Sequence, residues 1–189
     1  MTKVGYTFAG WDTTIPDTMP ANNLTLKALW TPLSVNYKII TYLENADNDD
    51  YTIFEEKSFT DFSDSKVKVD TETIFTEPFY YYLDHPEALY EGSVEGDGSL
   101  ILKAYLKRKT FNVTFNFYEG KNAETKSYKY GASNYLISSG ERIGHEFLSW
   151  IVSGKLDNAP DAVPGSNLEL TASWKRLSYT ILFEPNPSI

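Results

Sequence analysis

The stretch GYTFAGW, from Gly5 to Trp11, recurs as GHEFLSW from Gly144 to Trp150, with Gly, Phe and Trp at the first, fourth and seventh places. A second matching block follows each copy, MPANNLTLKALW from Met19 to Trp30 and VPGSNLELTASW from Val163 to Trp174. A third version of this block is DGSLILKAYL, from Asp97 to Leu106. Self-similarity at spaced positions is the signature of a repeat architecture. The sequence therefore predicts a tandem array of small units.

Alternating segments follow the repeated blocks: VNYKIITYLEN from Val35, TFNVTFNFYEG from Thr110 and SYTILFEPN from Ser178. Period-two alternation is typical of a strand with one buried face. The corresponding positions are Tyr37, Ile39 and Thr41, then Phe111, Val113 and Phe115, then Tyr179, Ile181 and Phe183. Each segment is predicted to be the first strand of a unit.

The starts of these predicted first strands divide the chain into four parts. Residues 1–32 are predicted to be the trailing half of a repeat unit, residues 33–108 and 109–176 to be whole units, and residues 177–189 to be the first strand of a further unit. On this interpretation GYTFAGW is the third strand of a unit whose hairpin is not in the sequence.

Within the unit 109–176 the order of elements predicts a small mixed fold. A hairpin is followed by SNYLISSG, where Ser133 is a candidate N-cap and Gly140 a candidate stop for a short helix. Two further strands complete the unit. We therefore expect an α+β, strand-dominated fold with the helix on one face of the sheet. Large rings are the leading core candidates: Phe8, Trp11, Trp30, Phe147, Trp150 and Trp174.

Composition narrows the function. The chain has 189 residues, an aromatic share of 15% and a net charge of −9. An acidic protein without a basic stripe repels a polyanion, so nucleic acid is not an expected partner. Cysteine is absent, which excludes disulfides and thiolate metal sites. The sequence has no apolar run of the roughly 18 residues that a membrane helix needs, so membrane insertion of this segment is not expected.

The Gly-x-x-Phe-x-x-Trp and Leu-x-Leu-x-Ala-x-Trp blocks resemble the Listeria–Bacteroides repeat, which is similar to the internalin B-repeat. The unit that begins at Val35 resembles the mucin-binding-protein-like repeats of bacterial surface adhesins. Two departures are His145-Glu146 after the glycine and FYYYL, Phe79 to Leu83, in place of a strand with Trp. The resemblance implies tandem β-grasp (ubiquitin-like) units in an elongated array. It also implies an extracellular location at the bacterial surface, with anchoring through parts outside this sequence and neighbouring repeat units as partners.

The acidic stretch NADNDDYTIFEE places oxygen ligands at positions 1, 3, 5 and 12, as in a calcium-binding EF-hand loop. The four residues are Asn45, Asp47, Asp49 and Glu56. Position 6 is Asp50, where the loop needs glycine, and the flanks alternate like strands. A solvated hairpin turn is the competing interpretation, and calcium is the one candidate cofactor.

Chemical motifs are otherwise missing. His85 and His145 fall in different units, and the sequence contains no nucleophile elbow, phosphate-binding glycine loop or zinc-protease motif. The chain is therefore not expected to be an enzyme. The run FYYYL offers a different candidate, because adjacent strand residues face opposite sides. Tyr80 and Tyr82 share one face and are candidate ligand-binding residues.

Two functions remain open. The first is a stalk or spacer built of units with very short joints. The second is a binding module that holds a host glycoprotein or polysaccharide through exposed tyrosines. The unpaired strand in residues 177–189 also predicts head-to-tail self-association with the orphan half at 1–32 of another molecule. Alternatively, residues 1–32 dock on the neighbouring unit of the same molecule.

Overall fold

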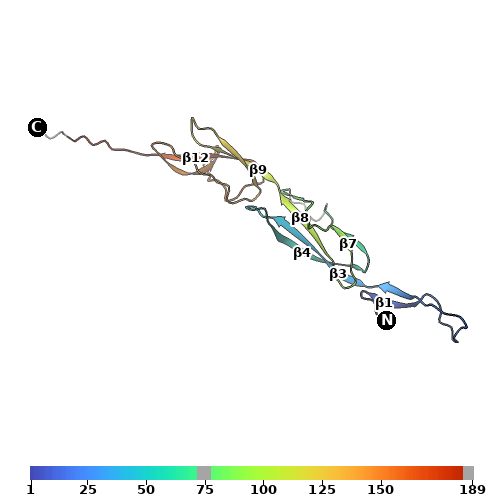
Figure 1. Ribbon diagram of the computed structural model, residues 1–189. Helices are drawn as coiled ribbons and strands as arrows, with labels where there is room; N and C mark the ends of the chain where they lie inside the picture. Colours follow the sequence, from blue (N-terminus) through green and yellow to red (C-terminus); the bar gives the residue numbers. More distant parts are fainter. Residues whose placement is uncertain (72–77, 185–189) are drawn as a thin grey trace. The chain divides into compact units, whose positions relative to one another are not determined.

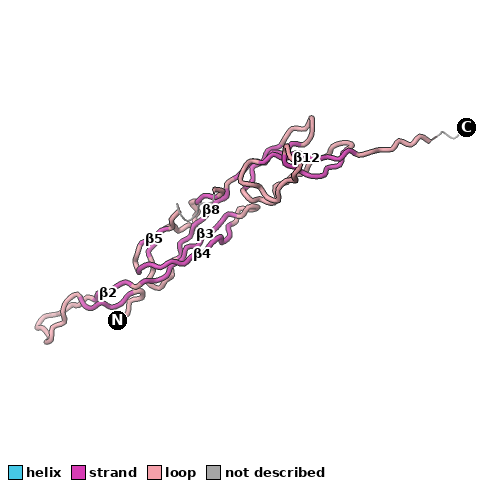
Figure 2. The backbone as a smooth tube through the Cα atoms, turned by 180° about the vertical axis from the view of Figure 1, so that it is seen from behind, coloured by secondary structure: helices cyan, strands magenta, loops and turns pink. Residues whose placement is uncertain are grey.

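The computed structural model describes residues 1–71 and 78–184. The chain divides into two compact units, Met1–Lys107 and Arg108–Ile189. All regular structure in the described residues is β-strand, and none is helical (Figure 2). The prediction of a strand-dominated fold is confirmed, and its helical part is wrong.

The first unit combines one four-stranded sheet with two pairs of strands. Its strands are β1 (Tyr6–Trp11), β2 (Ala28–Pro32), β3 (Ser34–Glu44), β4 (Tyr51–Phe62), β5 (Lys66–Lys68), β6 (Tyr80–Tyr82), β7 (Glu91–Ser93) and β8 (Ile101–Arg108). The larger sheet has the order β4-β3-β8-β6, with β3 antiparallel to β4 and parallel to β8 (Figure 1). The pairs β1-β2 and β5-β7 form two-stranded sheets.

The second unit is one four-stranded sheet. Its strands are β9 (Thr110–Asn116), β10 (Glu124–Lys129), β11 (His145–Val152) and β12 (Leu168–Arg176). The order is β10-β9-β12-β11, with two antiparallel pairs at the edges and a parallel pair, β9 and β12, in the middle. Both four-stranded sheets therefore place their strands in the order second, first, fourth, third. A parallel central pair requires the chain to cross over a face of the sheet between its two hairpins.

Alternating apolar side chains on β3 and β9, the first strands of the two four-stranded sheets, contribute to the two cores. On β9, Val113 and Phe115 are fully buried, whereas Thr114 between them is partly exposed. Trp150 is 4% exposed and meets the Phe115 ring edge-on at 5.0 Å. The buried members of this core are Val113, Phe115, Phe117, Ala132, Tyr135, Trp150, Val163, Leu168, Leu170 and Ala172. In the first unit, one core cluster contains Tyr37, Ile39, Val69, Val94, Leu102 and Ala104.

The segment between β10 and β11 covers the second core without forming the predicted helix. Tyr135 inserts its ring into the core, where it is 1% exposed, and its hydroxyl donates to the Pro160 carbonyl. The Val163 N–H donates to the Ala132 carbonyl, and the Val163 carbonyl accepts from the Gly131 N–H. The Trp150 indole donates to the Ile137 carbonyl at 2.9 Å. SNYLISSG is rich in Ser and Asn, which favour turns over helix interiors, and it is too short to be helical alone. Contacts with the core therefore fix an irregular path.

The β1-β2 pair repeats the geometry of the β11-β12 pair. Phe8 lies opposite Trp30 as Phe147 lies opposite Trp174, and each first strand has a bulge directly after its phenylalanine. The surroundings of the two strand pairs differ, and the Phe8 side chain is 40% exposed. The expectation that Phe8 is a core residue therefore does not describe this structure. The physical reason is that the β1-β2 sheet has two strands, whereas β11 and β12 lie in a sheet of four.

The β1-β2 pair is attached to the rest of the first unit at one end. The Gly5 carbonyl accepts hydrogen bonds from the Ser63 hydroxyl at 2.8 Å and from the Leu33 N–H at 2.8 Å. The Tyr6 hydroxyl donates to the Asp64 carboxylate. A Cβ added to Gly5 would lie 2.3 Å from the Gly96 Cα. The close approach of two glycines therefore fixes the hairpin on the turn before β8.

Candidate functional site

Four rings meet at one end of the β4-β3-β8-β6 sheet. Parallel pairing of β3 and β8 sets Tyr42 beside Tyr105, so their side chains share a face. The two rings stack at 4.8 Å with an interplanar angle of 11°. His85, in the loop after β6, stacks on Tyr105 at 3.9 Å, and Tyr51 at the start of β4 meets the Tyr105 ring edge-on at 5.3 Å. We call Tyr42, Tyr51, His85 and Tyr105 the ring cluster.

Hydrogen bonds orient the loop side of the ring cluster. The Glu87 N–H donates to His85 Nδ1 at 3.2 Å, which makes that nitrogen the acceptor of the ring. The Tyr105 hydroxyl donates to Glu87 Oε2 at 3.0 Å. Burial of Tyr105 and, after it, the hydrogen bond to the Glu87 carboxylate raise the pKa of Tyr105 to about 12. Tyr105 therefore remains a neutral hydrogen-bond donor throughout the physiological pH range.

A cavity of about 350 Å³ opens beside the ring cluster. Its remaining walls are the carboxylate residues Asp49, Asp50 and Glu87. Ring faces next to acceptor groups are suited to sugars and other hydroxyl-rich or cationic ligands, because the rings offer apolar stacking and the carboxylates accept hydrogen bonds. This cluster was not predicted from the sequence. Its signal lies in the β3-β8 register, which brings together residues far apart in the chain.

The predicted calcium turn connects β3 to β4 at the edge of this cavity. Asn48 Oδ1 accepts from the Asn45 side chain at 3.0 Å and from the Asp50 N–H at 2.9 Å, and the Asn45 N–H donates to the Asp50 carbonyl at 2.8 Å. Asparagine thus closes a hairpin turn through its side chain. The turn belongs to a hairpin and not to a loop between helices.

One of the four candidate calcium ligands lies outside the turn. Glu56 lies on β4 opposite Ile40, where it forms an ion pair with Lys38 at 2.7 Å. It stands five residues beyond Tyr51 on a strand that rises roughly 3.3 Å per residue. Among the described residues, no group of three or more His, Asp or Glu side chains is arranged to hold a metal ion. A calcium site at the turn would therefore require a ligand other than Glu56.

The tyrosine run on β6 faces in an unexpected direction. Tyr81 is 46% exposed, whereas Tyr80 and Tyr82 are both half-buried. Tyr82 packs against the core of the first unit and meets the Tyr90 ring edge-on at 6.2 Å. Burial raises the pKa of Tyr82, and in the described part of the chain its hydroxyl has no hydrogen-bond partner. Tyr82 of the candidate binding pair therefore points toward the core, whereas Tyr80 lies 6.5 Å from the exposed Phe54 ring. Tyr81 is the exposed residue of β6.

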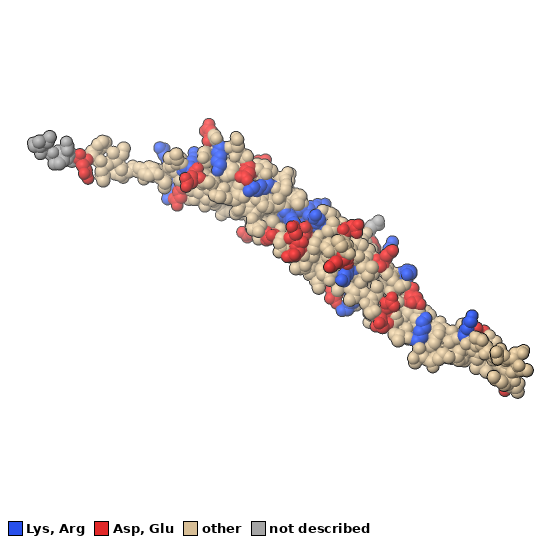
Figure 3. All heavy atoms as spheres, viewed as in Figure 1, with Lys and Arg blue, Asp and Glu red and all other residues tan. Residues whose placement is uncertain are grey.

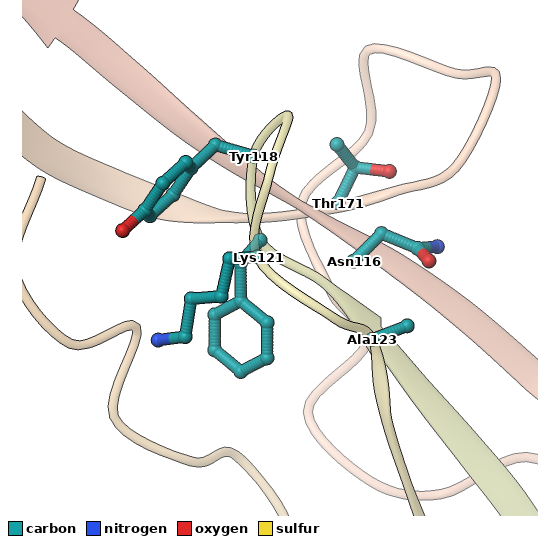
Figure 4. A pocket seen from close by; sticks show the side chains of 6 residues that line it. Asn116, Tyr118, Lys121, Ala123 and Thr171 are labelled. Atoms are coloured by element: carbon teal, nitrogen blue, oxygen red, sulfur yellow. The ribbon is translucent and has the colours of Figure 1, made fainter.

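A smaller hollow of about 220 Å³ lies in the second unit beside the β9-β10 turn. Figure 4 shows Lys121 and Tyr118 among the side chains that line it, and the Phe117 ring lines it as well. Lys121 Nζ lies 3.8 Å from the centre of that ring and donates to the Ser139 carbonyl at 3.1 Å. Because this lysine ties the turn to the segment after Tyr135, its role in the structure is to hold the two loops together.

Charged side chains of both signs are interspersed on the face shown in Figure 3. Exposed pairs such as Lys126–Glu124, 2.8 Å apart, belong to this surface. None of the described residues forms a helix long and apolar enough to cross a membrane.

Residues 111–173 match the Listeria-Bacteroides repeat domain. This segment, which runs from β9 into β12, is therefore a repeat of that family, and the resemblance predicted from its Phe, Trp and Leu positions is confirmed. Repeats of this family occur in bacterial surface proteins and are in general not catalytic. No curated protein matches the chain.

Proposed function

We propose that the chain is a non-catalytic, cofactor-free spacer segment of a bacterial cell-surface adhesin, built of tandem β-grasp units. The observation that carries the proposal is the common strand order, second, first, fourth, third, of the sheets β4-β3-β8-β6 and β10-β9-β12-β11. This is the strand order of a β-grasp fold, with an irregular segment in place of its helix. The β1-β2 pair adds the second half of one more such unit.

The joints between these repeats are very short. Leu33 alone separates β2 from β3, and Lys109 alone separates β8 from β9. A joint of one residue gives neighbouring units little freedom, which suits a spacer that must hold its length. The proposal places the segment outside the bacterial cell, with anchoring supplied by other parts of the protein.

Small-angle scattering on proteins with one, two and three copies of residues 33–176 tests the spacer function. A spacer predicts that the maximum dimension grows by a constant increment with each copy. Growth that stops, or a radius of gyration that follows flexible-chain scaling, would contradict it.

A binding function is the second candidate, and the ring-lined cavity favours it. A screen against host glycoproteins, mucin glycans and polysaccharides would identify a ligand, and Tyr51→Ala should remove its binding. Tyr81→Ala is the matched control, since Tyr81 is exposed but does not line the cavity. Loss of binding in Tyr81→Ala alone would move the site to β6. A screen without binding would leave the spacer function.

A further inference from the structure

The cavity beside the ring cluster differs in charge from two other ring-lined hollows of the chain. Lys121 lines the hollow at the β9-β10 turn of the second unit and lies over the Phe117 ring. Arg142 lines another hollow of that unit, of about 280 Å³, and its guanidinium carbon lies 5.3 Å from the centre of the Tyr118 ring. Each of these two hollows therefore has a cation of the chain itself beside an aromatic ring.

The described residues that line the cavity beside the ring cluster include no lysine or arginine. Three of them carry carboxylates, Asp49, Asp50 and Glu87, and the others are the four members of the ring cluster. Carboxylates and the faces of aromatic rings both attract a positive charge. A positively charged group is therefore the component that these walls lack.

The stack of rings decides which aromatic surface faces the cavity. Tyr42 and His85 both lie nearly parallel to Tyr105, with ring centres 4.8 Å and 3.9 Å from it. Two rings at these distances do not fit on one face of a third, so Tyr105 lies between them. Tyr105 is 3% exposed, whereas Tyr42, Tyr51 and His85 are half-buried. The outer rings therefore supply the aromatic surface of the cavity.

We propose that this cavity binds a protonated amino sugar of a polysaccharide, with the sugar ring against Tyr42 and Tyr51 and the ammonium group among the carboxylates. The proposal rests on the binding function, the second candidate function, and names the ligand class of that site. An ammonium group donates charge-assisted hydrogen bonds to carboxylates, which are roughly twice as strong as those of a neutral hydroxyl. Its charge is also attracted to the ring faces.

The size and the charge of the cavity agree with this ligand class. Its volume of about 350 Å³ lies within the range of roughly 300–1,000 Å³ that small-molecule sites occupy. An anionic sugar would meet three carboxylates on a chain with a net charge of −9. Acetylation of the amine removes the positive charge and leaves the rest of the sugar unchanged. The proposal therefore predicts selectivity for the free amine over the acetylated one.

Titration of the full chain with two soluble oligosaccharides tests this selectivity. One is an oligomer of glucosamine, and the other is the same oligomer with every amine acetylated. The glucosamine oligomer should shift the NMR signals of the ring cluster and bind about tenfold more tightly than the acetylated oligomer. Equal Kd values for the two would overturn the amine selectivity and leave the binding function intact. Unchanged ring-cluster signals with the glucosamine oligomer would also overturn the proposal, whereas the binding function would fail only if the wider screen found no ligand.

A pair of matched variants separates the cavity from the overall charge. Asp50→Asn with Glu87→Gln should weaken binding of the glucosamine oligomer severalfold and leave binding of the acetylated oligomer unchanged. The glutamine amide oxygen can still accept the Tyr105 hydroxyl, so the ring cluster should keep its shape. Glu124→Gln with Asp157→Asn removes the same charge at exposed residues that do not line the cavity, and should bind like the wild type. Equal weakening in the two double variants would show that the overall charge attracts the oligomer, and would overturn the proposal.

Discussion

Gly5 and Gly96 approach each other so closely that neither position has room for a side chain. A Cβ on Gly5 would lie 2.3 Å from the Gly96 Cα and 2.4 Å from the Ser63 hydroxyl oxygen. Gly144, the equivalent of Gly5 in the second unit, has a similar positive φ, 73° against 78°. No described atom lies within 4 Å of a Cβ added there. The two glycines thus share a backbone conformation and differ in packing.

Gly5→Ala should therefore destabilise the chain more than Gly144→Ala. The second change adds only the strain of a left-handed backbone, about 1–2 kcal/mol, whereas the first must also displace backbone. Amide hydrogen exchange should show faster opening of β1 in Gly5→Ala than of β11 in Gly144→Ala. Equal effects would mean that the hairpin does not dock at Gly96.

Trp150 and Trp11 form a second matched pair. Trp150→Ala empties a site in the core of the second unit and should lower the free energy of unfolding by about 3–5 kcal/mol. Trp11 is half-buried and packs edge-on against Phe8 at 5.4 Å. Its loss should cost less, about 1–2 kcal/mol. Urea unfolding followed by circular dichroism measures both, and a larger cost for Trp11→Ala would show that something else covers it in solution.

Loss of the side-chain hydroxyl should affect the stability of the protein differently at Tyr82 and at Tyr135. The Tyr82 hydroxyl is buried and lacks a partner among the described residues, so Tyr82→Phe should be neutral or stabilising. The Tyr135 hydroxyl donates to the Pro160 carbonyl, so Tyr135→Phe should cost about 1 kcal/mol. Thermal unfolding compares the two. A clear loss of stability in Tyr82→Phe would indicate a hydrogen bond to water or to another part of the chain.

The strands could be predicted from the sequence because the alternation of apolar and polar residues can be read from neighbouring residues alone. The pattern of Val113 and Phe115 fixed which face of β9 is buried. The blocks at Gly5–Trp11 and Gly144–Trp150 marked equivalent strands, which share even a bulge. The helix at SNYLISSG was predicted from end signals alone. Burial of Tyr135 outweighs those signals. Contacts between residues far apart in the chain cannot be read from the local sequence.

The candidate site was less accessible to sequence analysis. Alternation correctly separated Tyr81 from Tyr80 and Tyr82 but could not decide which face was exposed. The ligand spacing that included Glu56 assumed a compact loop, whereas a hairpin carries Glu56 away along β4. Stacking of Tyr42 on Tyr105 depends on the parallel register of two strands with most of the unit between them. No spacing rule within a single segment reports such a contact.

Alkaline pH should unfold the chain in a defined range. Burial raises the pKa of Tyr135 to about 12, and burial with the Glu87 hydrogen bond does the same for Tyr105. In the unfolded chain both titrate near the ordinary tyrosine value of 10.0. Between about pH 10 and 12 the unfolded state therefore loses protons that the folded state keeps. The stabilisation is complete below pH 10 and is lost as the pH rises, by up to about 1.4 kcal/mol per pH unit for each tyrosine.

Tyr105→Phe with Tyr135→Phe removes both titrations. The double variant should be less stable at pH 7, because it lacks two hydrogen bonds, but its unfolding free energy should fall less steeply from pH 10 to 12. Tyr179→Phe, at a residue that is 75% exposed, is the control and should keep the wild-type slope. Urea unfolding at half-unit pH steps gives the three curves. Parallel curves for the wild type and the double variant would show that other groups cause the alkaline transition.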